Sequence, residues 1–150
     1  MSTLYDIGRR SFLTEVTVGA FTGQTDWVAD DFQVVLVDLV EYPLADVSNH
    51  TSMADVPLAA RVAEVPLTNT VAQPDGTAAT SDLSTVFPNV TGAEVGAVII
   101  YRANNTATPV DADNVLIAYI DSAISGLPVD PNGGDITVLW NGGDGRIFRL

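Results

Sequence analysis

Residues 127–150 read LPVDPNGGDITVLWNGGDGRIFRL, and this stretch decides the fold prediction. Two apolar runs, 136–140 and 146–150, flank the Gly-rich residues 141–145, which is the spacing of a β-hairpin with a short loop. We expect the second run to be tied into a sheet, because a free end that carries Phe148 would fray and expose apolar surface. The stretch offers no reactive side chain, so it indicates how the chain is built.

Five further segments have the apolar pattern of β-strands. They are, in chain order, 32–40, 61–68, 81–87, 94–102 and 114–121, with Pro, Gly, Asn and Asp residues between them. The last two are the most apolar runs of the chain, so we expect them to be adjacent strands in the centre of a sheet. Pro66 removes a backbone donor and predicts an edge position for its strand. Together with the terminal hairpin, this predicts a mainly β protein, an antiparallel β-sandwich of about seven strands that is jelly-roll or immunoglobulin-like.

The N-terminal residues 1–17 give the one helical pattern of the chain. Ser2 is a candidate N-cap, and apolar residues from position 4 onward follow at roughly helical spacing. Residues 44–60 hold few aliphatic side chains in register, which predicts a long surface loop that is available for contacts. With 150 residues and no linker or repeat, we expect a single domain over 1–150.

The chain is strongly acidic, with 19 acidic residues, six arginines, no lysine and a net charge of −13. Repulsion between like charges disfavours nucleic acid and anionic membranes as partners. No apolar run reaches the roughly 18 residues of a membrane span, and the start of the chain lacks the pattern of a signal peptide. The absence of cysteine excludes disulfide and thiolate chemistry. Acidic pairs such as Asp30 and Asp31 are expected to be solvated loop charges.

Four of the six arginines lie near the two ends of the chain, namely Arg9, Arg10, Arg146 and Arg149. Exposed arginines commonly pair with the protein's own carboxylates, and such pairs contribute little to stability. The alternative is that they mark a surface that docks on an acidic partner or on a neighbouring copy of the chain. We therefore name them, together with His50, as candidate interface residues.

The residue types give little support to a catalytic or metal site. His50 is the only histidine and lies in a polar loop without a nucleophile motif, so we expect an exposed loop residue or an interface contact. One histidine and no cysteine cannot form the usual zinc ligand set. Asp130, Asn132 and Asp135 offer oxygens in one loop, but the same residue types form tight turns, so calcium is the alternative to turn chemistry. We expect neither enzymatic activity nor a cofactor.

Several segments are distinctive when they are taken together. They read LYDIGRRSFL (4–13), DWVADDFQVVLVDL (26–39), VPLAARV (56–62), VIIYR (98–102), LIAYIDSAISGLPVDPNGGDITVLW (116–140) and RIFRL (146–150). In this order they resemble a family of small virion-associated proteins of tailed phages, with LIAYID, GLPV-x-PNGGDI and IFRL as the most distinctive pieces. The family has no known reaction and no catalytic residues to transfer onto this chain.

The resemblance implies a viral structural protein that is made in the host cytoplasm and lies on the outer surface of the virion. The leading interpretation is a capsid decoration (cement) protein that binds the major capsid protein or other virion proteins, associates with copies of itself, as a trimer by analogy, and stabilises the head. The alternative is a tail-associated receptor- or glycan-binding module. Such a module needs exposed aromatic side chains, and the candidates, most of them in predicted strands, are Trp27, Trp140, Tyr42, Tyr101 and Tyr119.

Overall fold

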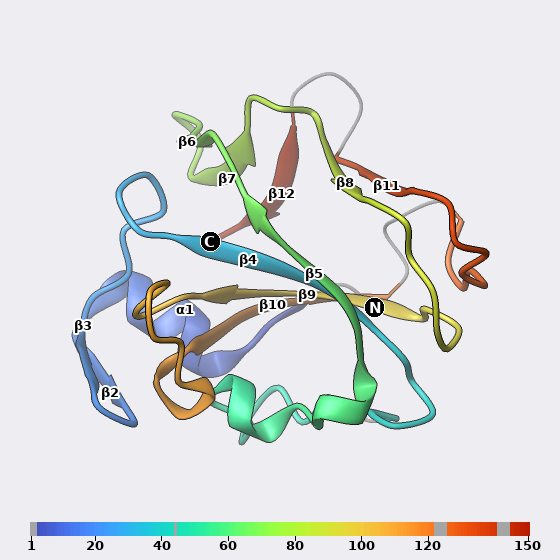
Figure 1. The fold of residues 1–150 in the computed structure, drawn as a ribbon. Helices are drawn as coiled ribbons and strands as arrows, with labels where there is room; N and C mark the ends of the chain where they lie inside the picture. Colours follow the sequence, from blue (N-terminus) through green and yellow to red (C-terminus); the bar gives the residue numbers. More distant parts are fainter. Residues whose placement is uncertain (1–2, 44, 122–125, 141–144) are drawn as a thin grey trace.

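The computed structural model describes residues 3–43, 45–121, 126–140 and 145–150. These residues form antiparallel β-sheets, one α-helix and three short 3-10 helices (Figure 1). The predicted mainly β class with one short N-terminal helix is therefore confirmed. The described residues hold twelve strands in four sheets, more strands than expected, because several of them are too short or too polar to give a sequence pattern.

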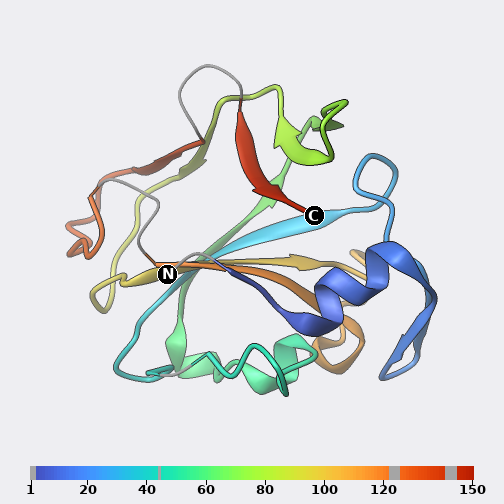
Figure 2. The same cartoon turned by 180° about the vertical axis from the view of Figure 1, so that it is seen from behind.

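A five-stranded antiparallel sheet forms the centre of the molecule (Figures 1 and 2). Its strands lie in the order β1 (Thr3–Leu4), β10 (Val115–Ile120), β9 (Ala97–Arg102), β4 (Phe32–Val37) and β5 (Arg61–Leu67). The most apolar segments form β9 and β10, which pair with each other as predicted. β5 contains Pro66 and lies at the edge of the sheet, which confirms the prediction made from that residue.

Both faces of the main sheet are apolar. In β4, Val34 and Leu36 join the core on one face, while Val35 and Val37 join a second core on the other face. All four side chains are at most 1% exposed. A sheet with two apolar faces needs a cover on each side, and the rest of the chain supplies both covers.

Two small sheets cover the first face and lie above the main sheet in Figure 1. One has the order β12 (Arg146–Arg149), β7 (Thr77–Thr80) and β6 (Thr70–Ala72), and the other pairs β11 (Ile136–Leu139) with β8 (Ser84–Phe87). Trp27 and Trp140 are buried in this core. The Trp27 indole donates to the Ala79 carbonyl oxygen at 3.0 Å. The Trp140 indole donates to Thr85 Oγ1 at 2.9 Å, so both buried N–H groups are satisfied.

The predicted terminal hairpin is wrong in its pairing. Both strands form, but β11 pairs with β8 and β12 pairs with β7 instead of with each other. This arrangement buries Trp140 and packs the Phe148 ring 5.0 Å from Trp27, and the burial of these large apolar side chains outweighs the local turn signal. Residues 141–144, in the predicted hairpin loop, lie outside the described residues.

Residues 45–60 cover the second face of the main sheet. They contain two 3-10 helices, η1 (Met53–Asp55) and η2 (Leu58–Ala60). Met53, Val56 and Ala60 are at most 1% exposed and belong to the second core. The sequence predicts a surface loop over 44–60. Many residues of the described part are exposed, while several of its apolar side chains pack inward because the apolar sheet face would otherwise meet water.

The helix α1 (Asp6–Leu13) is shorter than the helix predicted over 1–17. The preceding residues pair with β10 as a strand, so the helix begins after Tyr5, and the predicted cap Ser2 lies outside the described residues. At the other end Thr14 is extended, and the β-branched residues after it form β2 (Val16–Val18), which pairs with β3 (Phe21–Gly23). None of the described helices is long and apolar enough to cross a membrane.

Candidate functional site

Arginines from the two ends of the chain meet at one hollow of the surface. A cavity of about 270 Å³ is lined by Arg9 of α1 and Arg149 of β12. The other lining residues are Thr3 and five apolar residues, Leu4, Ala118, Ile120, Ile147 and Phe148. Figure 2 shows β12 running from the small sheets toward the main sheet on the side of α1. We call this feature the arginine hollow.

Arg9 is positioned by the close packing of α1 on the main sheet. A Cβ atom on Gly8 would lie 2.6 Å from the Leu116 carbonyl oxygen and 2.7 Å from Ile117 Cα. Only glycine therefore allows the helix to approach β10 this closely. With Gly8 against the sheet, the next two residues, Arg9 and Arg10, are exposed.

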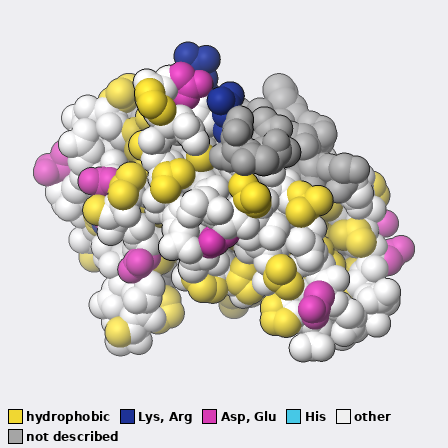
Figure 3. Space-filling view, turned by 90° about the horizontal axis from the view of Figure 1, so that it is seen from above, with side chains coloured by type: hydrophobic (Ala, Val, Ile, Leu, Met, Phe, Trp, Pro, Cys, Tyr) yellow, Lys and Arg dark blue, Asp and Glu magenta, His cyan; other side chains and the backbone are white. Residues whose placement is uncertain are grey.

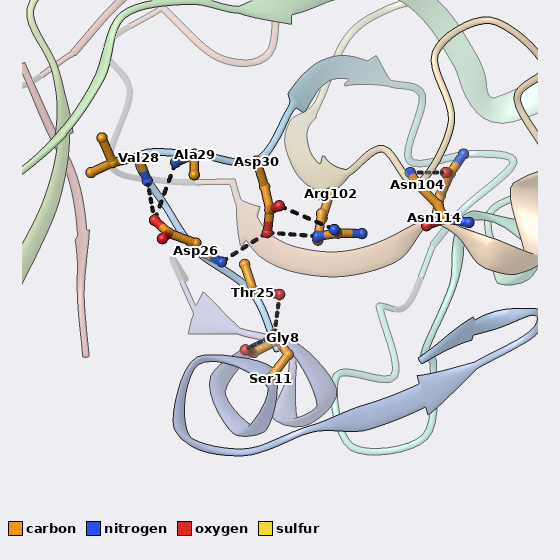
Figure 4. Close-up of polar contacts among 10 residues, drawn as sticks. All are labelled: Gly8, Ser11, Thr25, Asp26, Val28, Ala29, Asp30, Arg102, Asn104 and Asn114. Atoms are coloured by element: carbon orange, nitrogen blue, oxygen red, sulfur yellow. Dashed lines mark hydrogen bonds and ion pairs between the residues drawn. The ribbon is translucent and has the colours of Figure 1, made fainter. Parts of the chain in front are cut away.

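Ser11 ties the same helix to the loop that precedes β4 (Figure 4). The Ser11 hydroxyl donates to the Gly8 carbonyl oxygen at 2.7 Å and accepts from Thr25 Oγ1 at 2.8 Å. The Thr25 N–H also donates to the Ser11 carbonyl oxygen at 2.8 Å. Ser11 and Thr25 are buried, so these bonds satisfy polar groups that water does not reach. The position of α1 relative to the loop is therefore fixed.

Phe148 holds β12 beside the hollow. It lies opposite Ala78 in the pairing of β12 with β7. Its ring centroid is 5.0 Å from Trp27 in an edge arrangement and 5.9 Å from Phe12 of α1. These aromatic contacts join β12 to both the helix and the core. Arg149, the next residue, thereby shares the lining with an arginine from the other end of the chain.

The arginine hollow is suited to a carboxylate that lies next to an apolar group. Arg9 is 3.9 Å from Asp6, and both side chains are more than half exposed, so this weak ion pair leaves the guanidinium accessible. Guanidinium groups bind carboxylates through paired hydrogen bonds, and the apolar lining can bury a side chain beside them. Apart from the arginines, Thr3 is the one polar residue in the described lining. The chemistry of this lining is that of a binding surface.

Arg146 lies at the start of β12 and is exposed, but it is not among the described lining residues. Together with Arg149 it acts on Asp75. Hydrogen bonds from Thr77 lower the pKa of Asp75 below its usual value, and the positive charges of the two arginines lower this pKa further. In the view of Figure 3, arginine side chains lie beside an acidic side chain at one edge of the molecule. Part of the basic surface is therefore balanced by the chain itself.

The two remaining candidate interface residues lie elsewhere. Arg10 is exposed in the last turn of α1, where a positive charge stabilises the helix. His50 is half-buried and lies beside the second core, with Nδ1 2.6 Å from Tyr42 Oη and the two rings stacked at 5.5 Å. Tyr42 Oη is also 3.2 Å from Tyr5 Oη, and burial raises the pKa of both phenols. The structure therefore separates His50 from the arginine hollow.

A partly buried ion pair that the sequence did not predict lies near the helix (Figure 4). Asp30 accepts from Arg102 Nε at 2.8 Å and from Nη2 at 3.1 Å, with the arginine 12% and the aspartate 20% exposed. The guanidinium also lies 4.0 Å above the ring of Phe21. The expectation of a solvated charge is wrong for Asp30, because the end of β9 brings Arg102 against it, although Asp31 is exposed. No local pattern links two residues 72 positions apart.

Two of the three candidate calcium ligands accept hydrogen bonds from backbone N–H groups. Asp135 Oδ1 accepts from the Asn89 N–H at 3.0 Å, and Asn132 Oδ1 accepts from the Gly134 N–H at 2.9 Å. Asp130 is exposed. Within the described ranges, no three histidine or carboxylate side chains are grouped so as to hold a metal ion. Calcium stays a prediction for this loop.

No family model, curated protein or solved structure matches the chain. The resemblance to virion proteins therefore stays a prediction made from the sequence segments. What bears on function is the geometry of the described surface, and above all the arginine hollow.

Proposed function

We propose that this protein is a structural component of a tailed-virus particle and acts as a decoration protein on the outer face of the head. The resemblance of segments such as 116–140 to small virion proteins supports a structural role. The observation that carries the proposal is the arginine hollow, in which Arg9 and Arg149 lie beside an apolar lining in a chain of net charge −13.

Charge distinguishes the surface that binds from the surface that faces solvent. A carboxylate on the capsid protein would pair with a guanidinium of the hollow, and a neighbouring apolar side chain would be buried in its lining. The strongly acidic remainder would stay in water, where negative charge keeps the protein soluble. The hollow would therefore set the orientation of the protein on the shell.

Binding would stabilise the head by mass action. A protein that binds the assembled shell, but not separated subunits, shifts the equilibrium toward the assembled state. If each copy spans a joint between capsid subunits, separating the subunits also requires breaking the decoration contact. A specific contact of ordinary size buries roughly 1,600 Å² in total, and many such contacts on one head would oppose rupture.

The glycan-binding alternative depends on aromatic side chains that a sugar ring could reach. The candidates are all at most 8% exposed: Trp27, Trp140, Tyr42, Tyr101 and Tyr119. Their rings are occupied by core contacts, so they provide no stacking surface in this conformation. The decoration role is therefore the better supported of the two proposals.

The test is the temperature at which full heads rupture, followed by release of packaged nucleic acid. Particles that lack the protein are expected to rupture at a lower temperature than complete particles, and added purified protein should restore the difference. Equal rupture temperatures with and without the protein would contradict a decoration role. Immunogold label confined to the tail tip would support the tail-associated alternative.

Variants test the surface that is assigned to binding. The double variant Arg9→Ala/Arg149→Ala is expected to bind heads at least about tenfold more weakly, because a hydrogen bond to a charged group contributes about 1.5–3 kcal/mol. Arg10→Ala on the same helix is the matched control and should bind like the unchanged protein. Equal losses for both variants would mean that the hollow is not the contact.

A further inference from the structure

The strand β11 (Ile136–Leu139) has an open edge. It pairs with β8 on one side, and among the described residues no strand pairs with its other side. Figure 1 shows β11 at the periphery of the molecule, away from the main sheet. An open strand edge presents unpaired N–H and C=O groups and is a template for pairing with another strand.

The register identifies which backbone groups face the open edge. The Trp140 N–H donates to the Leu83 carbonyl oxygen at 2.8 Å, so this is a hydrogen-bonded pair of the β8–β11 ladder. Such pairs alternate along an antiparallel ladder, which makes Val138 and Thr85 the next one. The N–H and C=O groups of Thr137 and Leu139 therefore point away from β8, toward the open edge.

The exposed side chains of the two strands themselves are uncharged, and several are large and apolar. Leu139 of β11 is 71% exposed. Val86 of β8 is 48% exposed, and Leu83, the residue before β8, is 44% exposed. Residues 83–87 and 136–140 contain no charged side chain. Figure 3 shows hydrophobic side chains in the right-hand part of its view, where β8 and β11 lie, with acidic side chains toward the rim. Natural edge strands usually carry charges or proline that prevent association, and this edge lacks both.

We propose that β11 pairs with β11 of a second copy of the chain, antiparallel and about a two-fold axis at Val138. In this register Thr137 of one copy lies opposite Leu139 of the other. Both residues direct their backbone groups to the open edge, so the two symmetric pairs exchange four hydrogen bonds. In no other antiparallel register do Thr137 and Leu139 of one copy both lie opposite Thr137 and Leu139 of the other. The two β8–β11 sheets become one four-stranded sheet.

Charge favours the antiparallel orientation of the two copies over the parallel one. The charged residue nearest to β11 in the sequence is Asp135. Antiparallel pairing about Val138 places the two Asp135 residues six positions apart along the strands, roughly 20 Å, which exceeds the screening length of about 8 Å at physiological salt. Parallel pairing would place them side by side, at roughly 5 Å. Antiparallel pairing therefore avoids the close approach of the two Asp135 side chains that parallel pairing would create.

The contact is weak for free protein. Four residues from each copy cover much less than the roughly 1,200 Å² of a stable interface. Neighbouring sites on a particle hold copies at a high effective concentration, and there a weak contact forms. The occurrence of this contact on a particle rests on the proposed function, but the pairing itself is measurable with free protein.

Disulfide trapping tests the register, and the cysteine-free chain gives a clean background. The Thr137→Cys/Leu139→Cys variant is expected to form a cross-linked dimer on mild oxidation, because opposed residues of a hydrogen-bonded pair have Cα atoms about 5.5 Å apart, within disulfide range. Leu139→Cys alone should cross-link at least about tenfold less, since the two Leu139 Cα atoms would be roughly 8.5 Å apart. Equal cross-linking by both variants, or none by the double variant, would overturn the proposed pairing.

Sedimentation at up to about 1 mM, a typical effective concentration for tethered partners, tests the contact without a cross-link. The protein is expected to dimerise with rising concentration, and Thr137→Pro should reduce the dimer fraction about tenfold, because proline removes an N–H that faces the open edge but not one that faces β8. Thr137→Ala keeps the N–H and is the control. A monomer at all concentrations would refute the pairing while leaving the rupture experiment on heads unaffected.

Discussion

Asp30 and Arg102 form an ion pair that is far more enclosed than the surface pair of Arg9 and Asp6. Removing one member of an enclosed pair leaves a charge without a partner in a poorly solvated position, which costs several kcal/mol. We expect Asp30→Asn to lower the free energy of unfolding by about 3 kcal/mol, measured by urea denaturation. Asp31→Asn, at the exposed neighbouring position, should change it by less than about 0.5 kcal/mol. Equal effects of the two variants would show that the pair contributes little.

The same pair predicts a dependence on pH. Burial alone raises the pKa of Asp30, but the hydrogen bonds from Arg102 and Asp26 and the charge of Arg102 outweigh it, so this pKa lies below its usual value. A carboxylate with a lowered pKa contributes its full stabilisation above the unfolded-state pKa of about 3.9 and loses it as the pH falls through the folded-state value. The stability difference between the unchanged protein and Asp30→Asn should therefore be constant above about pH 5 and shrink below it.

At the scale of elements, β12 depends on Phe148 for its attachment to the rest of the fold. The ring contacts both Trp27 and Phe12 and is half-buried. We expect Phe148→Ala to lower the free energy of unfolding by about 2 kcal/mol, less than the 3–5 kcal/mol typical of a fully buried phenylalanine. Leu150→Ala is the control, because Leu150 is 55% exposed. If both variants unfold at the same denaturant concentration, β12 is not held by this contact.

The buried strands are the elements that the sequence predicts well. β4, β9 and β10 are buried on both faces, so their apolar runs are continuous and stand out from the turns around them. β7 could not be recognised in the same way. Its residues, TAAT, are all buried, yet two threonines and two alanines give no apolar run. Whether small residues such as those of β7 are buried depends on which other residues pack against them in the fold.

Strand pairing is less predictable than strand existence. The Gly-rich spacing of 141–145 is a local signal, and it correctly separates two strands. Which strands they pair with depends on contacts between distant residues, such as Trp140 with Thr85 and Phe148 with Trp27. The helix end is a similar case, because the β-branched residues after Thr14 weaken the helix but the pairing of β2 with β3 ends it.

At the scale of the whole molecule, the arginine hollow exists only because the fold brings the two ends of the chain together. The sequence identifies Arg9 and Arg149 as unusual because they are basic residues in an acidic chain. It does not indicate that they line one cavity, nor that Arg10 and His50 lie away from it. Those facts depend on Gly8 against β10 and on Phe148 against the core. Composition therefore predicts that a basic surface exists, and tertiary packing determines which arginines form it.

A net charge of −13 on 150 residues also predicts how the whole molecule responds to salt. Repulsion among the carboxylates opposes the compact state, and added salt screens it. We expect the midpoint of thermal unfolding to rise by roughly 3 °C between low salt and about 0.5 M NaCl, equivalent to about 1 kcal/mol. The variant Glu15→Gln/Glu41→Gln/Glu94→Gln removes three exposed negative charges and should be more stable at low salt with a smaller rise. A midpoint that falls with salt in both proteins would mean that favourable ion pairs, such as Arg61 with Asp111, outweigh the repulsion.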